Sequence, residues 1–249
     1  MKEKLTQLCE NYNIPIKKID PEKMTFYGTQ KYNEQILINY LIELDNLLKS
    51  NLISIGGFSA GSKILGFRSM RRISNDLDCI TNEEGIKLLN EHFHDNLFQT
   101  LDYGDLFLEY KKVPVSFDIE ETHGWKIPKD FFEDIRRFSF LNGGLNSISP
   151  EYLIGLKTRR SINKKRFYGK DALDTINVLL SPFYRSELKE IDYEKIGKII
   201  REHASNKREE IEAYLSFIGS YSNHIKKKEI PLFEKSLNNL KHHTIKNIF

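Results

Sequence analysis

Leu52-Ile-Ser-Ile-Gly-Gly-Phe-Ser59 is the stretch that decides the fold. A short apolar run that ends at two glycines is typical of a buried strand entering a tight turn, and a helix is expected to follow. Residues 33 to 50, just before this run, repeat apolar side chains at spacings of three and four, which predicts an amphipathic helix. The sequence around the glycines therefore predicts helix, strand, turn and helix in that order.

Strands and helices continue to alternate up to residue 181. Ser149, Pro150 and Glu151 supply an N-cap, a first-turn proline and a first-turn acid, so a helix is expected to start there. A short helix is also expected within the first 32 residues. Further strands are expected at residues 76–80, 97–101, 106–110 and 113–119, and further helices at residues 83–96, 150–163 and 168–180.

The character of the chain changes at Ser181 and Pro182, because no alternating β pattern follows the proline. Three helical segments are expected beyond it, near residues 186–204, 206–226 and 231–247. We therefore expect an α/β fold of the mixed α+β type. A mixed sheet flanked by helices is expected in residues 1–181, and a C-terminal helical bundle in residues 182–249.

The composition is that of a globular protein. Apolar residues make up 39 % and aromatic residues 12 % of the 249, and 38 basic residues nearly balance 35 acidic ones, which excludes a disordered or fibrous chain. Cys9 and Cys79 are too few for a disulfide framework, which points to a reducing compartment. Because no apolar run has the length of a signal peptide or membrane helix, we expect a cytoplasmic protein without a membrane partner.

Basic residues are concentrated in one segment. Residues 157–170 contain seven cations and no anion, although the net charge of the chain is only +3. A concentrated basic segment on an otherwise acidic body suits a site that holds metal ions beside a polyanion. A solvated, lysine-rich helix face would give the same pattern.

Asp76 and Asp78 are the sharpest local signal for chemistry. Residues two apart in a strand point to the same face, so both carboxylates would face one pocket, where Mg²⁺ or Mn²⁺ would neutralise their repulsion. Two aspartates on a water-facing edge strand would look the same. Asp118 favours the metal site, because a carboxylate would otherwise interrupt the apolar strand 113–117. Cys79 alternates away from the aspartates and is expected to be buried.

Gly56 and Gly57 offer a place for a phosphate group. Glycines permit close approach of a ligand to the backbone, and the helix expected after them presents free N–H groups at its N-terminus. Taken alone, two glycines are also an ordinary turn.

The order of these motifs resembles the nucleotidyltransferase-fold proteins of the AbiEii/AbiGii toxin type, which include the MenT-like toxins. Two matches are Gly56-Gly57-Phe58-Ser59 after a strand and Arg72-Ile-Ser74-Asn-Asp76-Leu-Asp78, which is similar to the family's Arg-x-Ser/Thr-x-Asp-x-Asp. The others are the later strand aspartate Asp118, and the helix lysine Lys157 followed by Arg166 and Lys170-Asp171-Ala-Leu-Asp174. Together the matches span about residues 50 to 180.

The resemblance implies a role for each matching residue. The implied metal ligands for Mg²⁺ or Mn²⁺ are Asp76, Asp78 and Asp118, of which Asp118 also helps to activate the acceptor hydroxyl. The implied nucleotide contacts are Gly56, Gly57, Ser59, Ser74 and Lys157, with Lys157 reaching the phosphates. The implied acceptor contacts are Arg72, Arg160, Lys164 and Arg166. Asp171 and Asp174 either line the far wall of this pocket or form a plain solvated helix face.

The spacing departs from the wider superfamily. Eighteen residues, 58 to 75, separate Gly57 from Asp76, where about nine to thirteen are usual. Thirteen residues separate Gly61-Ser62 from Asp76, so Gly61-Ser62 is an alternative candidate for the phosphate turn. We prefer Gly56-Gly57 because it directly follows an apolar strand, and we interpret the excess as an insertion around residues 66–71.

By this resemblance the chain is expected to be an enzyme that moves a nucleoside monophosphate from an NTP to a hydroxyl, with release of pyrophosphate. The implied acceptor is RNA, such as a tRNA 3′ end, and the implied setting is a toxin–antitoxin system with an antitoxin protein as partner. Two alternatives remain: a non-catalytic module that binds nucleotide or RNA, and a nucleotidyltransferase that modifies a protein hydroxyl.

Overall fold

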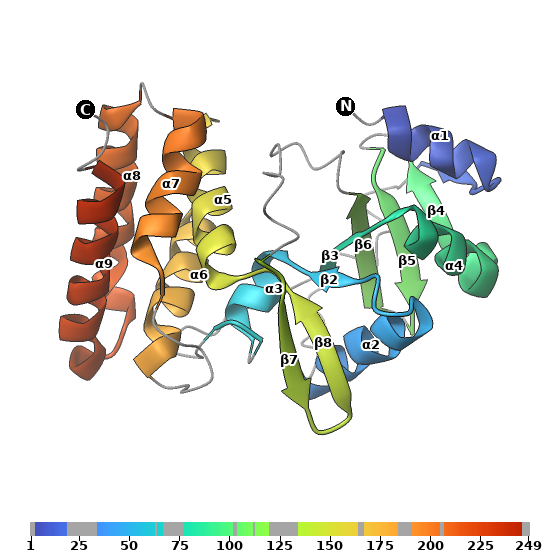
Figure 1. Ribbon diagram of the computed structural model, residues 1–249, viewed down its shortest axis with the longest axis horizontal. Coiled ribbons are helices and arrows are strands. Elements are labelled where there is room, and N and C mark those ends of the chain that lie inside the picture. Colours follow the sequence, from blue (N-terminus) through green and yellow to red (C-terminus); the bar gives the residue numbers. More distant parts are fainter. Residues whose placement is uncertain are drawn as a thin grey trace. The chain divides into compact units, whose positions relative to one another are not determined.

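The computed structural model describes residues 3–18, 34–62, 64–66, 77–101, 104–111, 113–119, 134–163, 167–183, 191–204 and 207–245 (Figure 1). It divides into two compact units. The sheet unit comprises Met1–Phe58 and Ile73–Ile148, and the helical unit comprises Ser59–Arg72 and Ser149–Phe249. This division differs from the boundary expected at residue 181, because the two helices before that residue pack against the helices that follow it.

An eight-stranded mixed sheet forms the core of the sheet unit, in the order β1-β4-β5-β6-β3-β2-β8-β7. The β1–β4, β6–β3 and β2–β8 pairs are parallel and the others are antiparallel. The strands are β1 (Ile16–Lys17), β2 (Ile53–Ser54), β3 (Leu77–Thr81), β4 (Leu97–Thr100), β5 (Leu106–Tyr110), β6 (Val113–Ile119), β7 (Arg136–Phe140) and β8 (Gly143–Ser147).

Helices accompany this sheet along the chain. They are α1 (Glu3–Asn11), α2 (Glu34–Leu47), α3 (Gly56–Gly61) and α4 (Glu83–Phe93), which continues into a short 3₁₀ turn, His94–Asn96. α2 packs against β8, and α4 packs against β4. The side chain of Asn82 caps α4 by accepting a hydrogen bond of 2.9 Å from the N–H of Gly85.

The parallel register of β3 and β6 gives one apolar, buried face and one face that carries Asp78, Ser116 and Asp118 together with Ile80. Leu77, Cys79 and their partners Val115 and Phe117 are buried on one face. Asp78 and the residues that alternate with them therefore face the other side of the sheet. The expected burial of Cys79 is confirmed.

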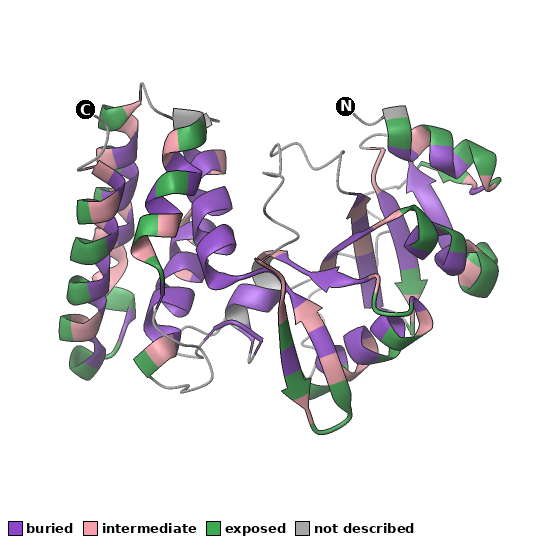
Figure 2. Cartoon of the chain, viewed as in Figure 1, coloured by how far each residue is buried: buried purple, intermediate pink, exposed green. Residues whose placement is uncertain are grey.

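The helical unit contains five α-helices in its described part (Figure 1). α5 is buried from Glu151 to Arg159, as Figure 2 shows by its purple colour, and it contacts α6, α7 and α8. The five are α5 (Pro150–Asn163), α6 (Gly169–Leu180), α7 (Tyr193–Ala204), α8 (Arg208–Ser220) and α9 (Ile230–Ile245), with 3₁₀ turns at Ser181–Phe183, Tyr221–His224 and Lys227–Glu229. Within the described ranges, no helix combines the length and apolar character needed to cross a bilayer.

Most elements expected from the sequence are confirmed. The helix over 33–50, the strand before the glycines, the 97–110 hairpin, the strand 113–119 and the helices at 150–163 and 168–180 all occur within a few residues of their expected bounds. The hairpin of β7 and β8 and the two-residue β1 were not expected. Their strands carry few apolar residues, and only Phe138, Leu145 and Ser147 are buried in the hairpin.

One buried acid in the sheet unit is incompletely neutralised. The side chain of Asp45, on α2, is fully buried, and its Oδ2 lies 3.4 Å from Nη1 of Arg137 on β7. Burial raises the pKa of Asp45, because Arg137 and a hydrogen bond from the Leu52 backbone only partly offset the loss of water. The neutral carboxyl is therefore favoured by folding.

This makes the stability of the protein depend on pH in a definite direction. The folded state holds a proton on Asp45 more tightly than the unfolded chain does, so this contribution to stability is present below the ordinary carboxyl pKa and is lost as pH rises through the raised pKa. One proton gives a slope of at most about 1.4 kcal/mol per pH unit. We expect urea unfolding of Asp45→Asn at a series of pH values to lack this slope.

Glu43 supplies a control of opposite sign. Hydrogen bonds from Lys111 and Tyr110 lower the pKa of Glu43, so its contribution is gained as pH rises. That gain is complete once pH reaches the ordinary carboxyl pKa, so Glu43→Gln should remove a rise in stability at acidic pH and leave the decline at higher pH unchanged. Identical pH profiles for Asp45→Asn and the wild type would contradict the assignment.

Candidate active site

Asp78 and Asp118 lie on one face of two neighbouring parallel strands. In the β3–β6 register, Asp78 is opposite Ser116 and Asp118 is opposite Ile80. Because side chains alternate along a strand, all four face the same side of the sheet. Both aspartates are half-buried, so water and a ligand can reach their carboxylates. The expected common face for Asp78 and Asp118 is present, with the two residues as diagonal neighbours.

Ser116 is the closest polar neighbour of Asp78 on this face. Its hydroxyl donates a hydrogen bond of 3.1 Å to Oδ1 of Asp78. This bond orients Oδ1 of the Asp78 carboxylate. The surroundings of the other oxygen, Oδ2, are set by Gly56. Sequence reasoning missed Ser116, although a hydroxyl two residues before Asp118 on the same strand face was a usable signal.

Gly56 receives the other side of the Asp78 carboxylate. The Gly56 backbone has φ +74°, and a Cβ atom built there would lie 2.7 Å from both Cβ and Cγ of Asp78 and still closer to Oδ2. The Ile55 N–H donates a hydrogen bond of 2.9 Å to the Asp78 carbonyl, which holds the two segments together. Only glycine meets both the positive φ and the close approach at residue 56.

The two rival glycine pairs have different surroundings. Gly56 and Gly57 open α3 directly after β2, as expected for the preferred phosphate turn, except that the helix starts at Gly56 itself. Gly61 ends α3, and the buried Ser62 accepts a hydrogen bond of 3.2 Å from the Ile64 N–H. Ser59 is fully buried within α3. The geometry thus brings Gly56 against an aspartate of the candidate site.

Several expected site residues lie outside the described residues. They are Arg72, Ser74, Asp76, Lys164 and Arg166. Within the part of the chain that the structure describes, no group of three His, Cys, Asp or Glu side chains is arranged to hold a metal ion. Asp78 and Asp118 are the described members of the expected carboxylate set.

Lys157 lies in a buried ion cluster of the helical unit. Its Nζ is 3.0 Å from Oδ1 of Asp171 and 2.8 Å from Oδ2 of Asp174, and all three side chains are at most 4 % exposed. The solvated-face alternative for Asp171 and Asp174 is therefore wrong, because both carboxylates are fully buried on α6. The expected contact of Lys157 with phosphates stays a prediction. In the structure this lysine is already paired with Asp171 and Asp174.

The ion cluster affects a neighbouring tyrosine. Tyr214, on α8, is fully buried, and burial together with the charges of Asp171 and Asp174 raises its pKa. Sequence reasoning placed no functional residue on α8. The spacing of Tyr214, Phe217 and Tyr221 along one helix face was the available signal.

Arg160 is the described member of the expected acceptor contacts. It is half-buried at the end of α5, with its Cζ 5.3 Å from the ring centroid of Tyr168. The preceding Arg159 is buried, and burial lowers its pKa to about 10. The basic segment is therefore partly folded into the helical unit and is not a continuous solvated face.

Comparisons with known proteins give little beyond these observations. No protein-family model matches the chain, and comparison with curated proteins also found no match. Among solved structures, the chain is similar to an antigenic nucleotidyltransferase-like protein from Paracoccidioides brasiliensis, with a TM-score of 0.48 and 16 % sequence identity over 82 % of this chain and 92 % of that one. At this TM-score the likeness carries no inference about function, which has to come from the residues themselves.

Removing the Lys157 charge should destabilise the helical unit. Lys157→Met leaves two buried carboxylates without their cation, which typically costs about 3–5 kcal/mol in the free energy of unfolding. Chemical denaturation should show this loss, and adding Asp174→Asn to the variant should recover part of it. Lys170→Met is the control, since Lys170 is exposed and should change stability by no more than about 0.5 kcal/mol. Equal effects at the two lysines would contradict the buried cluster.

A side chain at residue 56 should displace Asp78. Gly56→Ala combines a left-handed backbone, which costs about 1–2 kcal/mol, with overlap against Asp78. Asp78→Gly removes the overlapping atoms. A double-mutant cycle by urea denaturation should therefore give a coupling of about 1 kcal/mol or more between the two positions. Strict additivity would show that the two residues do not touch.

Proposed function

We propose that this chain is a metal-dependent nucleotidyltransferase that moves a nucleoside monophosphate from an NTP to a hydroxyl group of an RNA acceptor. The observation that carries the proposal is the pair of half-buried carboxylates, Asp78 and Asp118, on one face of two adjacent strands. The opposite face of these strands is apolar and buried. Partial burial of two carboxylates costs free energy, and a bound cation would offset that cost.

The donor set suits a hard divalent cation. Carboxylate oxygens are the preferred ligands of Mg²⁺ and Mn²⁺, and one oxygen of Asp78 is already oriented by the Ser116 hydroxyl. Asp76, which shares the parity of Asp78, would be a further ligand. When bound, the metal would lower the pKa of the acceptor hydroxyl and neutralise charge on the departing pyrophosphate.

Residues of the chain would position the reactants and accept the proton in the transfer reaction. The acceptor oxygen would attack the α-phosphorus of the NTP, and the bond from that phosphorus to the bridging oxygen of the β-phosphate would break, releasing pyrophosphate. Asp118 would accept the proton of the acceptor hydroxyl. Gly56 and Gly57 would contact phosphate oxygens through the backbone. At Gly56 the Asp78 carboxylate fills the space that a Cβ atom would take, so a phosphate there would also lie beside Asp78. Ser59, Ser74 and Lys157 are kept as nucleotide contacts on the family resemblance alone.

The proposed acceptor is RNA, with a tRNA 3′ end as the specific candidate. Support comes from the basic residues of segment 157–170, where cations that are not buried would favour a polyanion. Lys157 and Arg159 are buried and do not add to this support. Arg72, Arg160, Lys164 and Arg166 would contact it. A toxin role with an antitoxin partner is part of the same proposal and would appear as growth arrest on expression, relieved when Asp78 is replaced.

A transfer assay tests the proposal. Protein is incubated with each α-³²P-labelled NTP, Mg²⁺ or Mn²⁺, total tRNA and a protein extract, and the labelled pool is identified. We expect label in RNA, with a loss of at least about a thousandfold in rate for Asp78→Asn and Asp118→Asn. The control is Asp95→Asn, an exposed acid outside the site.

Each other outcome of this assay favours one alternative. Label in protein would replace the RNA acceptor with a protein hydroxyl. Nucleotide binding without any label transfer would leave a non-catalytic binding module. Transfer by Asp78→Asn at the wild-type rate would remove Asp78 from the chemistry.

A further inference from the structure

A row of aromatic rings follows one face of α8 from the core of the helical unit to its surface. Tyr214, Phe217, Tyr221 and His224 are spaced by three, four and three residues, so they lie along one side of the helix and its 3₁₀ extension. Tyr214 is fully buried, Phe217 and Tyr221 are half-buried, and His224 is exposed. The row therefore has one end inside the protein and one end open to solvent.

Adjacent rings in this row are in contact. The Tyr214 and Phe217 centroids are 6.4 Å apart, those of Phe217 and Tyr221 5.1 Å, and those of Tyr221 and His224 5.2 Å. The last pair is stacked, with an interplanar angle of 29°. His224 therefore presents a ring that is supported by Tyr221 and exposed to solvent.

The basic segment meets this row of rings. Phe167 packs against both Tyr214 and Phe217, at 5.3 Å and 5.5 Å between centroids. A Cβ atom at Gly169 would collide with the hydroxyl of Tyr221, so the start of α6 lies directly against that ring. Lys170 follows immediately and is exposed, with its Nζ 6.0 Å from the Tyr168 centroid.

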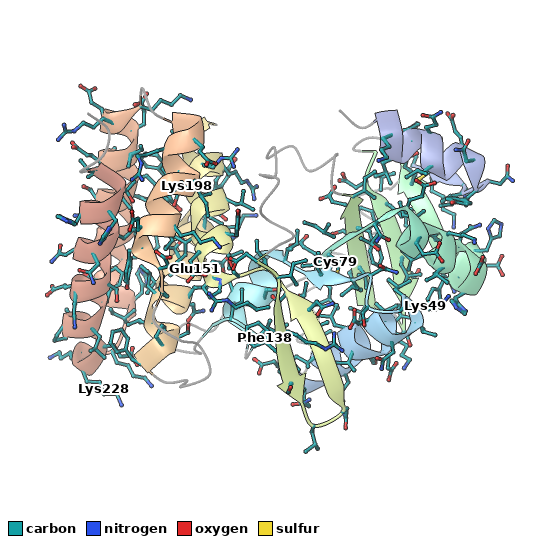
Figure 3. All side chains as sticks on the ribbon, in the orientation of Figure 1. Lys49, Cys79, Phe138, Glu151, Lys198 and Lys228 are labelled. Atoms are coloured by element: carbon teal, nitrogen blue, oxygen red, sulfur yellow. The ribbon has the colours of Figure 1, made fainter. Side chains whose placement is uncertain are left out.

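A second group of cations lies beyond the exposed end of the row. Lys226, Lys227 and Lys228 follow His224 by two to four residues and are all exposed, and Figure 3 shows Lys228 at the outer edge of the helical unit. Within the described residues, neither these lysines nor Lys170 form an ion pair. Of the neighbouring acids, Asp171 is buried with Lys157, and Glu229 is buried where its Oε2 accepts a hydrogen bond from the Lys226 N–H.

We propose that these residues form a binding surface for single-stranded nucleic acid. An unpaired base would stack on the exposed face of His224, extending the Tyr221–His224 stack, and the backbone phosphates would contact Lys170 and Lys226–Lys228. An exposed aromatic ring beside several exposed cations suits single-stranded nucleic acid, because every base has a flat face that can stack and every nucleotide has a phosphate. A folded acidic protein could form ion pairs with the lysines, but it has no unpaired base to stack on the His224 ring.

This surface needs neither a metal ion nor an NTP. Binding there is therefore independent of the proposed transfer reaction, and only its use as the acceptor site rests on the proposed function. The two can be tested separately, since binding is measurable in EDTA without nucleotide.

The test uses the full chain and a fluorescein-labelled 12-nucleotide single-stranded RNA, followed by anisotropy in EDTA at several salt concentrations. We expect His224→Ala to weaken binding about tenfold, from the loss of one stacked base. Lys227→Gln should lower the slope of log K against log salt by about 0.7, the effect of one lost phosphate contact on a single strand.

Matched controls lie on α9. His242 and Lys235 are exposed there, so His242→Ala and Lys235→Gln remove the same groups at residues that belong neither to the aromatic row nor to Lys226–Lys228. Both should bind RNA like the wild type. A blunt-ended duplex RNA should bind His224→Ala and wild type equally, because its bases are already stacked.

Three results would overturn the proposal. The first is RNA affinity within twofold of wild type for both His224→Ala and Lys227→Gln. The second is equal losses in the α9 controls. The third is displacement of the RNA by polyglutamate at matched charge concentration, which would mean that the surface binds polyanions by charge alone. If the wild-type chain shows no RNA binding in EDTA but transfers label in the assay above, this inference is removed and the proposed function stands.

Discussion

The close approach of Gly56 to Asp78 is the constraint on which the candidate site depends. At this point a positive φ and the absence of a Cβ atom let the first residue of α3 lie against a carboxylate on β3. The Ser116 hydroxyl holds the same carboxylate from the neighbouring strand. Asp78 is thus oriented by one backbone position and one hydroxyl, and the parallel register of β3 and β6 puts Asp118 on the same face. The proposed metal and nucleotide chemistry needs this orientation before any ligand arrives.

The helical unit depends on a different polar arrangement. Lys157, Asp171 and Asp174 carry one positive and two negative charges where water is excluded, so each carboxylate depends on the lysine. Such a cluster specifies how α5 and α6 pair, since a slip of either helix would leave a charge unmatched. It also explains why a lysine that looks like a phosphate ligand in the sequence is an internal counter-ion in the structure. Lys170 and Lys226–Lys228, in contrast, are exposed cations of this unit.

Local patterns predicted most of the fold because they arise from strong local causes. The helix before the glycines, the β4–β5 hairpin and the strand containing Asp118 each have clear apolar periodicity, and each is present. The β7–β8 hairpin has little apolar content, and its place beside β2 depends on pairing between residues far apart in the chain. Such pairing leaves no local signal. The division into units escaped prediction for a similar reason, since α5 and α6 look like the helices of an α/β alternation until their partners are known.

The candidate site shows the same limit. Asp78, Asp118 and Gly56 could be identified from residue type and spacing, and the geometry brings Asp78 to both Gly56 and the Asp118 face. Ser116 and the aromatic row on α8 were not identified, because a serine in a strand and tyrosines in a helix are ordinary core or surface residues until their neighbours are seen. Burial of Asp171 and Asp174 could not be inferred either, since an Asp-x-x-Asp spacing fits a solvent-exposed helix face as well as a buried one.

Binding of Mn²⁺ is the most direct test of the central claim, that the Asp78 face holds a divalent cation beside a nucleotide. Electron paramagnetic resonance measures free Mn²⁺ during titration of the protein with and without a non-hydrolysable NTP analogue. The account predicts that wild type binds Mn²⁺ more tightly with the analogue present, and that Asp78→Asn and Asp118→Asn lose this enhancement while Asp95→Asn keeps it. Equal Mn²⁺ binding by wild type and Asp78→Asn, with and without the analogue, would contradict it.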